Sequence, residues 1–283
     1  MTHKKIIFLG SRFHVLEELL LEEGVSNIVI YALAGSLLEK ILIEKQISFN
    51  VFSMDDKEQV LEGLLASEFD ILISNGCPII FPVNKFKKHQ ILINIHPTYL
   101  PYLQGKTPLN GVFYNSYDFY GATMHYIDEG IDTGAIILQK KVTLTPDIDL
   151  GLLYHLAMKL EGTVFKQGWK MLKEANFSYI GKKQKGKPSY FNRTINKQSI
   201  DFKTQTTDEL LRAIKSFGIE TQGCFSTIEG VKYKIIDAEK ITHKPLLLMY
   251  GKMPPGEVIL NYDSKLLVKT IDGIVKITRY RII

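Results

Sequence analysis

Residues 1–95 alternate short apolar runs with segments whose apolar residues recur at helical spacing, and this alternation limits the possible folds more than any other feature. The runs contain few polar residues, which is typical of parallel strands buried on both faces. We expect strands at residues 5–9, 28–32, 49–52, 70–74 and 91–95, and helices at residues 13–23, 36–45 and 55–67. Ser36 and Asp55 are the expected N-caps of the second and third helices. The pattern predicts an α/β fold with a Rossmann-like, mostly parallel sheet that carries helices on both faces.

The pattern changes in the second half of the chain. Residues 120–126 and 135–142 predict an antiparallel pair of strands, and a long amphipathic helix is expected over residues 149–175. After a helix at residues 208–217, short strands with glycine turns are expected at residues 224–236, 246–250, 257–260, 266–270 and 275–282. We therefore expect one domain over residues 1–180, a linker segment over residues 181–202 and a small β-rich C-terminal module over residues 203–283.

The composition excludes several classes of protein. The chain has 35 basic and 30 acidic residues in mixed order, so its net charge of +5 creates no overall field that demands nucleic acid as a partner. Its two cysteines, Cys77 and Cys224, exclude a disulfide scaffold or a cysteine zinc site and fit a reducing cytosol. The N-terminal apolar run is too short for a signal peptide, and no apolar run approaches the roughly 20 residues of a membrane span. We expect a soluble cytoplasmic protein without membrane contact.

Three polar or glycine-containing turns follow predicted strands, at residues 10–12, 75–78 and 94–96. Open parallel sheets bind ligands beyond the carboxyl ends of their strands, so these turns mark the expected site. Asn94 and His96 are two residues apart on a strand, which places the amide and the imidazole on the same face. Gly10-Ser11-Arg12 is not a dinucleotide-binding fingerprint, so we expect no NAD.

The stretch from Ile93 to Gly134 resembles the folate-dependent formyltransferases. The matching residues occur in the family's order over the whole stretch: Asn94-Ile95-His96, Leu100-Pro101, Gly105, Pro108, Gly121-Ala122-Thr123 and Asp132-Thr133-Gly134. The resemblance is weaker from residue 1 to about residue 200. It implies that residues 1–180 form the catalytic domain of a one-carbon transferase.

The resemblance implies that Asn94, His96 and Asp132 are the catalytic residues. In formyl transfer an amine attacks the formyl carbon, the carbonyl oxygen becomes negative and the amine nitrogen becomes positive. The Asn94 amide can donate to that oxygen, His96 can take the proton of the amine, and Asp132 can orient the imidazole and assist proton movement. No metal and no covalent intermediate are needed. Considered singly, each of these residues is more often part of a structural turn than of a site, and only their joint occurrence in order favours a catalytic role.

The resemblance also implies that 10-formyltetrahydrofolate is the co-substrate. Residues 74–82 match the loop that holds the pterin in the family, and the backbone of residues 128–131 is expected to form the opposite wall. The candidate folate-binding residues are Cys77, Ile79, Ile80, Phe81, Asp128 and Gly130. On residue types alone, the first loop can equally be a proline-bounded part of the core.

The segment after His96 carries the information about the substrate. Members of the family formylate glycinamide ribonucleotide, methionyl-tRNA or nucleotide-linked amino sugars. The residues Pro97-Thr98-Tyr99-Leu100-Pro101 are similar to the sugar N-formyltransferases, as are Met124-His125-Tyr126 and residues 190–193, and Gln104 stands where the tRNA enzymes have arginine. The resemblance implies a dTDP- or UDP-linked amino-deoxy sugar, used for surface polysaccharide such as O-antigen or capsule. The alternatives are a methionyl-tRNA formyltransferase and a folate or nucleotide-sugar binding module without turnover.

The pyrophosphate of such a substrate requires cations or polar donors. The candidate substrate-binding residues are Arg12, Lys106, Thr107, Tyr190 and Arg193, with Tyr190 able either to stack on the base or to pack at a domain junction. The basic run at residues 181–188 predicts a solvated linker or mobile loop, with a grip on phosphates as the alternative. The apolar edge strands expected in the C-terminal module are compatible with a homodimer.

Overall fold

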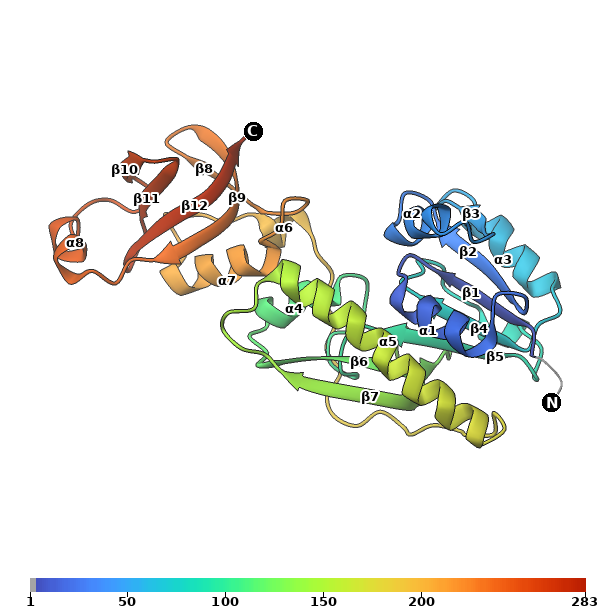
Figure 1. The fold of residues 1–283 in the computed structure, drawn as a ribbon. Coiled ribbons are helices and arrows are strands. Elements are labelled where there is room, and N and C mark those ends of the chain that lie inside the picture. The colour runs from blue at the N-terminus through green and yellow to red at the C-terminus, as the bar shows by residue number, and fades with distance from the viewer. Residues whose placement is uncertain (1–3) are drawn as a thin grey trace. The chain divides into compact units, whose positions relative to one another are not determined.

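The computed structural model describes residues 4–283, and Figure 1 shows its ribbon. The chain divides into two compact units. The first contains the described residues up to Pro108 together with Phe119–Thr143 and His155–Tyr190. The second contains Leu109–Asp118, Leu144–Tyr154 and Phe191–Ile283.

The first unit is built on a seven-stranded sheet with the order β3-β2-β1-β4-β5-β6-β7. Neighbouring strands from β3 to β5 pair in parallel, while β6 pairs antiparallel with β5 and with β7. The strands are β1 (Ile6–Gly10), β2 (Ile28–Leu33), β3 (Asn50–Phe52), β4 (Ile71–Asn75), β5 (Ile91–His96), β6 (Phe119–Tyr126) and β7 (Ile136–Thr143). The prediction of a mostly parallel sheet is confirmed.

Two hydrophobic cores lie on opposite faces of this sheet. On β1, Ile6 and Phe8 join a core with residues of α1, α2 and α5. Ile7 and Leu9 point the other way and join a second core with Leu64 of α3. The helices are α1 (His14–Glu23), α2 (Leu37–Glu44), α3 (Lys57–Ala66), the short 3₁₀ helix η1 (Val83–Lys85) and the long α5 (Leu150–Glu174). Helices therefore cover both faces, as the apolar runs predicted.

The two expected helix caps have different outcomes. Ser36 caps α2, because its side chain accepts a hydrogen bond from the backbone N–H of Glu39. The prediction for Asp55 is wrong: α3 begins at Lys57 with Asp56 at the N-cap position. The Asp56 carboxylate accepts instead from the backbone N–H and hydroxyl of Ser53, so it closes the preceding turn rather than the helix end.

The second unit contains a five-stranded antiparallel sheet with the order β10-β11-β12-β9-β8. Its strands are β8 (Cys224–Ile228), β9 (Val231–Lys240), β10 (Val258–Tyr262), β11 (Lys265–Lys269) and β12 (Ile274–Ile282). Its short helices are α6 (Ile195–Gln198), α7 (Thr207–Phe217) and α8 (Lys244–Met249), while α4 (Pro108–Tyr114) begins at the unit boundary. The prediction of a small β-rich module is confirmed.

The strand expected at residues 246–250 is wrong, because this segment forms α8. Pro245 lies in the first turn of the helix, where its fixed φ angle suits helical backbone and its missing N–H costs nothing. Leu248 and Met249 are 83% and 72% exposed, so the apolar run is not buried within the unit as a strand would be. Among residues 4–283, no helix is long and apolar enough to span a membrane.

Candidate active site

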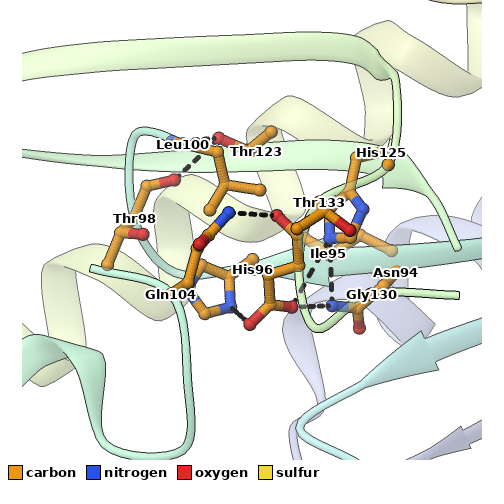
Figure 2. A network of polar contacts seen from close by, with 12 residues as sticks. Asn94, Ile95, His96, Thr98, Leu100, Gln104, Thr123, His125, Gly130 and Thr133 are labelled. Atoms are coloured by element: carbon orange, nitrogen blue, oxygen red, sulfur yellow. Dashed lines mark hydrogen bonds and ion pairs between the residues drawn. The ribbon is translucent and has the colours of Figure 1, made fainter. Parts of the chain in front are cut away.

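The side chains of the candidate site come from the end of β5 and from the connection between β6 and β7. Asn94 and His96 are the last polar residues of β5, and Asn94 lies directly opposite His125 of β6 in the antiparallel register. Figure 2 shows Asn94, His96, Gln104 and His125 gathered around the turn that carries Gly130 and Thr133. The strand pairing thus brings together residues that are about thirty positions apart in sequence.

The carboxylate of Asp132 lies at the centre of this group. Its Oδ2 accepts a hydrogen bond from the backbone N–H of Gly105 at 3.0 Å and lies 3.5 Å from Nδ1 of His96. Its Oδ1 accepts from Nδ2 of Asn94 at 3.2 Å and lies 3.7 Å from Nε2 of His125. Burial alone would raise the pKa of Asp132, but the positive charge of His96 or His125, when either is protonated, and the hydrogen bond from the Gly105 amide lower it well below its ordinary value. Asp132 is therefore ionised at neutral pH.

The backbone of the turn is held from two sides. Asp132 has a φ of +56°, in the left-handed region that few side chains adopt, and its carbonyl accepts from Nε2 of Gln104 at 2.9 Å and from Nε2 of Gln184 at 2.8 Å. Gln184 also donates to the carbonyl of Gly134 at 2.9 Å. A Cβ at Gly134 would lie 1.8 Å from the carbonyl oxygen of Tyr126, so this position requires glycine.

His96 is buried, and its hydrogen bond determines which ring nitrogen is basic. Its Nε2 lies 2.9 Å from the carbonyl oxygen of Leu103, so Nε2 carries the hydrogen and donates it. In the neutral ring Nδ1 then carries the lone pair, and Nδ1 is the atom that faces Asp132. Burial lowers the pKa of His96 although Asp132 and the Leu103 carbonyl act in the opposite direction. The ring is therefore neutral at pH 7 and can accept a proton on Nδ1.

The candidate folate-binding loop follows β4, the parallel neighbour of β5. Ile79 and Phe81 are buried in the core that contains Leu9, whereas Ile80 is 70% exposed. Cys77 is partly buried and free, and burial raises the pKa of its thiol to about 12. In this loop, Ile80 is the candidate whose side chain is most exposed.

The other candidate folate-binding residues lie in the β6–β7 turn, and both are exposed. The Asp128 carboxylate accepts from the backbone N–H of Gly130 at 3.1 Å and from the hydroxyl of Thr133 at 2.6 Å. These bonds close the turn that ends in Asp132. The turn and the loop after β4 lie at the ends of the neighbouring strands β4, β5 and β6.

Arg12 forms an ion pair instead of presenting a free charge. Its guanidinium donates to Oε1 of Glu161 at 2.6 Å, and the same oxygen accepts from Nδ2 of Asn75 at 3.1 Å. Asn75 Nδ2 also donates to the carbonyl of Ile95, the residue between Asn94 and His96. Burial raises the pKa of Glu161 to about 7, although Arg12 and Asn75 act in the opposite direction.

The remaining candidate substrate-binding residues lie in three places. Lys106 is exposed and Thr107 is partly buried, and both directly follow Gly105. Tyr190 is 58% exposed and lies beside Gln104, with which it forms an isolated parallel bridge. Arg193 belongs to the second unit and is exposed.

Sequence reasoning did not identify three residues of the site. His125 belongs to a segment that resembles the family but has no role assigned from the sequence. Gln184 lies in the run that was expected to be a solvated linker. Glu161 lies on the long helix, where the sequence indicated only an apolar face. A glutamate on the buried side of an amphipathic helix is a usable signal, because a buried charge needs a partner. Nothing in the sequence around Gln184 indicates the contacts that it makes. Within residues 4–283, no group of three or more His, Cys, Asp or Glu side chains is arranged to hold a metal ion.

Comparison with known proteins identifies the relatives of this chain. A family described as formyl transferase matches residues 40–167, and its C-terminal domain matches residues 194–282. A methionyl-tRNA formyltransferase of Caldanaerobacter subterraneus subsp. tengcongensis is 30% identical over 189 residues, which is 65% of this chain and 57% of that protein. The chain thus spans less than two thirds of the length of this curated relative.

Two solved structures share the fold. An N-formyltransferase from Helicobacter canadensis, in complex with folinic acid and dTDP-3-aminofucose, is 23% identical with a TM-score of 0.71 over 98% of this chain and 100% of its own. HypX from Aquifex aeolicus, in complex with tetrahydrofolic acid, is 18% identical with a TM-score of 0.68 over 99% of this chain and 44% of its own. At these identities the likeness is one of fold. With both family domains matched in order along the sequence, the chain belongs to the formyl transferase family.

Proposed function

We propose that this protein transfers a formyl group from 10-formyltetrahydrofolate to the amine of a dTDP- or UDP-linked amino-deoxy sugar. The observation that carries the proposal is the convergence of Asn94, His96 and Asp132 at the end of β5, with a neutral imidazole beside an ionised carboxylate. This arrangement supplies a base, a hydrogen-bond donor and a compensating negative charge within one small volume.

His96 acts as the base in the proposed reaction. The amine nitrogen forms a bond to the formyl carbon, and its proton passes to Nδ1 of His96, directly or through a water molecule. Nε2 keeps its hydrogen because it is bound to the Leu103 carbonyl. The imidazolium that forms is stabilised by the Asp132 carboxylate, whose Oδ2 is 3.5 Å from Nδ1. The bond between the formyl carbon and the folate nitrogen then breaks, and that nitrogen takes up a proton.

Asn94 is proposed to stabilise the negative charge that develops on the formyl oxygen. Its Nδ2 donates to Asp132 and faces Nε2 of His125. One of these hydrogens must turn toward the formyl oxygen as that oxygen becomes negative, which is the usual role of a preorganised donor. The hydrogen that faces Asp132 is the more replaceable, since that carboxylate keeps the Gly105 amide as a donor.

The folate is proposed to lie between the loop after β4 and the β6–β7 turn. The exposed Ile80 side chain and the backbone around Asp128 and Gly130 are the parts of these segments that a pterin can reach. Ile79 and Phe81 support the loop from the core. Such a pocket combines apolar contact with backbone hydrogen bonds, which is the composition that small-molecule sites favour.

Gln104 supports an amino sugar rather than tRNA as the acceptor. Its side chain is 1% exposed and donates to the Asp132 carbonyl, so this position presents no cation to a phosphate backbone. Lys106, Thr107 and Tyr190 stay as proposed contacts of the nucleotide. The charge of Arg12 is already balanced by Glu161, which makes it a weaker candidate for the pyrophosphate.

The relatives named methionyl-tRNA formyltransferase favour a second candidate, formylation of initiator methionyl-tRNA. The solved Helicobacter canadensis enzyme, whose complex holds an amino-sugar nucleotide, favours the first. Both thiols of the described residues are free, which fits the reducing cytoplasm where either acceptor is made. A role in surface polysaccharide synthesis and a homodimer remain part of the proposal.

The two functions separate in a single set of reactions. The protein is incubated with 10-formyltetrahydrofolate and either a panel of dTDP- and UDP-amino sugars or initiator methionyl-tRNA. Mass spectrometry detects a formylated sugar, and a filter-binding assay detects formyl-methionyl-tRNA. We expect formylation of at least one amino sugar and none of the tRNA. Formylation of the tRNA alone would replace the first proposal with the second.

A further inference from the structure

We propose that His125 is a positioning residue that fixes which end of the Asn94 amide faces the reacting formyl group. This inference rests on the proposed function, because it concerns the donor used in that reaction. His125 is 2% exposed and lies directly opposite Asn94 across the β5–β6 pair. Its Nε2 lies 3.2 Å from Nδ2 of Asn94.

The surroundings of His125 fix its tautomer. Its Nδ1 lies 2.8 Å from the carbonyl oxygen of Tyr126, so Nδ1 carries a hydrogen and donates it. In the neutral ring Nε2 then has a lone pair and accepts the hydrogen bond from Asn94. Gly134 allows this arrangement, because a Cβ there would lie 1.8 Å from the Tyr126 carbonyl oxygen and 3.4 Å from Nδ1 of His125.

The imidazoles of His125 and His96 are therefore set as opposite tautomers. His96 donates from Nε2 to the Leu103 carbonyl, whereas His125 donates from Nδ1 to the Tyr126 carbonyl. Each ring presents its unprotonated nitrogen toward Asp132, at 3.5 Å and 3.7 Å. Two backbone carbonyls thus assign one ring as the proton acceptor and the other as the fixed acceptor for Asn94.

A fixed acceptor matters because an asparagine amide can turn over. Rotation by half a turn would place the Asn94 oxygen against the lone pair of His125 Nε2, where two acceptors repel each other. Asp132 also selects the nitrogen end, but its hydrogen bond is lost when that hydrogen of Asn94 turns toward the formyl oxygen. His125 offers the lone pair of Nε2 to the other hydrogen of Asn94, while its own hydrogen is bound to the Tyr126 carbonyl. It therefore holds the Asn94 NH₂ toward the formyl oxygen when Asp132 no longer does.

Two substitutions at His125 separate positioning from packing. A glutamine amide reaches the position of the imidazole Nε2, so His125→Gln keeps an acceptor for Asn94 but loses the donor to Tyr126. An asparagine amide reaches only the position of Nδ1, so His125→Asn keeps the donor to Tyr126 and loses the acceptor for Asn94. His89→Gln, at an exposed histidine before β5, is the matched control.

We expect His125→Asn to lower kcat by about 10- to 100-fold with little change in KM, which is the loss that one orphaned hydrogen-bond partner gives. His125→Gln should stay within about threefold of wild type, although it loses more thermal stability than His125→Asn. A purely structural role would give the opposite order, with activity following stability. Equal losses of kcat in both variants, or an unchanged kcat in His125→Asn, would overturn the inference.

A spectroscopic measurement tests the inference without turnover. In ¹⁵N-labelled wild-type protein, long-range ¹H–¹⁵N spectra distinguish protonated from unprotonated ring nitrogens. We expect the hydrogen on Nδ1 for His125 and on Nε2 for His96. A hydrogen on Nε2 of His125 would contradict the inference even if the protein proves to be an active formyltransferase. Inactivity of the wild-type protein toward every acceptor would instead contradict the proposed function and leave the tautomers to be judged by the spectra.

Discussion

Replacing Gln184 with methionine should loosen the turn that carries Asp132. The side chain amide of Gln184 donates to the carbonyls of Asp132 and Gly134 at 2.8 and 2.9 Å. Methionine fills a similar volume but donates no hydrogen bond. The substitution therefore removes both donors while largely keeping the packing of the segment.

The expected loss of stability depends on the hydrogen-bond partners that the Asp132 and Gly134 carbonyls keep. The Asp132 carbonyl keeps the amide of Gln104 at 2.9 Å, so it is not orphaned. The Gly134 carbonyl loses the Gln184 donor, and an unsatisfied acceptor of this kind costs about 1–3 kcal/mol. Because Asp132 already has a φ of +56°, part of this cost should appear as displacement of its carboxylate. If half of this cost reaches the transition state, the transfer rate falls roughly 2- to 13-fold.

The assay compares Gln184→Met with Lys185→Met, a substitution at an exposed neighbour in the same segment. Urea unfolding gives the free energy of unfolding, and single-turnover transfer from 10-formyltetrahydrofolate gives the rate. We expect the first variant to lose both stability and rate and the second to keep both. If the two variants are indistinguishable from each other in both measurements, Gln184 does not hold the turn.

Three further predictions concern other residues of the chain. Gly134→Ala should abolish transfer and lower the melting temperature, because the new Cβ would lie 1.8 Å from the Tyr126 carbonyl oxygen; normal activity would contradict the close approach. The folded protein holds the proton of Glu161 more tightly than the unfolded chain does, so its contribution to stability should decline as pH rises from 4.5 to about 7. Glu161→Gln should flatten that slope in urea unfolding, and an unchanged slope would refute the assignment. Burial raises the pKa values of the Cys77 and Cys224 thiols to about 12, so both should resist iodoacetamide at pH 8 until the protein is unfolded, as mass spectrometry of alkylated peptides would reveal.

The parallel sheet was predictable because each of its strands has a characteristic local sequence pattern. An uninterrupted run such as Ile71–Asn75, buried along its whole length, has few alternatives to a central strand. The apolar run in α8 was wrongly predicted as a strand, because a short apolar segment does not by itself distinguish strand from helix. There Pro245 was the informative residue, since it suits the first turn of a helix.

The candidate site was predictable only in part. The spacing of Asn94 and His96 follows from strand geometry, and Asp132 followed from the family resemblance. The contacts of His125, Gln184 and Glu161 depend on strand register and on the return of distant segments to the sheet. These are tertiary contacts, and the residues near them in sequence do not indicate which distant segments they meet.

The central claim is that Asn94, His96 and Asp132 together move a formyl group, and one measurement tests it most directly. Transfer of an isotopically labelled formyl group from 10-formyltetrahydrofolate is followed in wild type, Asn94→Ala and His96→Asn, with calorimetry of nucleotide-sugar binding to each protein. We predict labelled amino sugar from the wild type only, with nucleotide-sugar binding still measurable in both variants. Turnover at the wild-type rate in both variants would contradict the account.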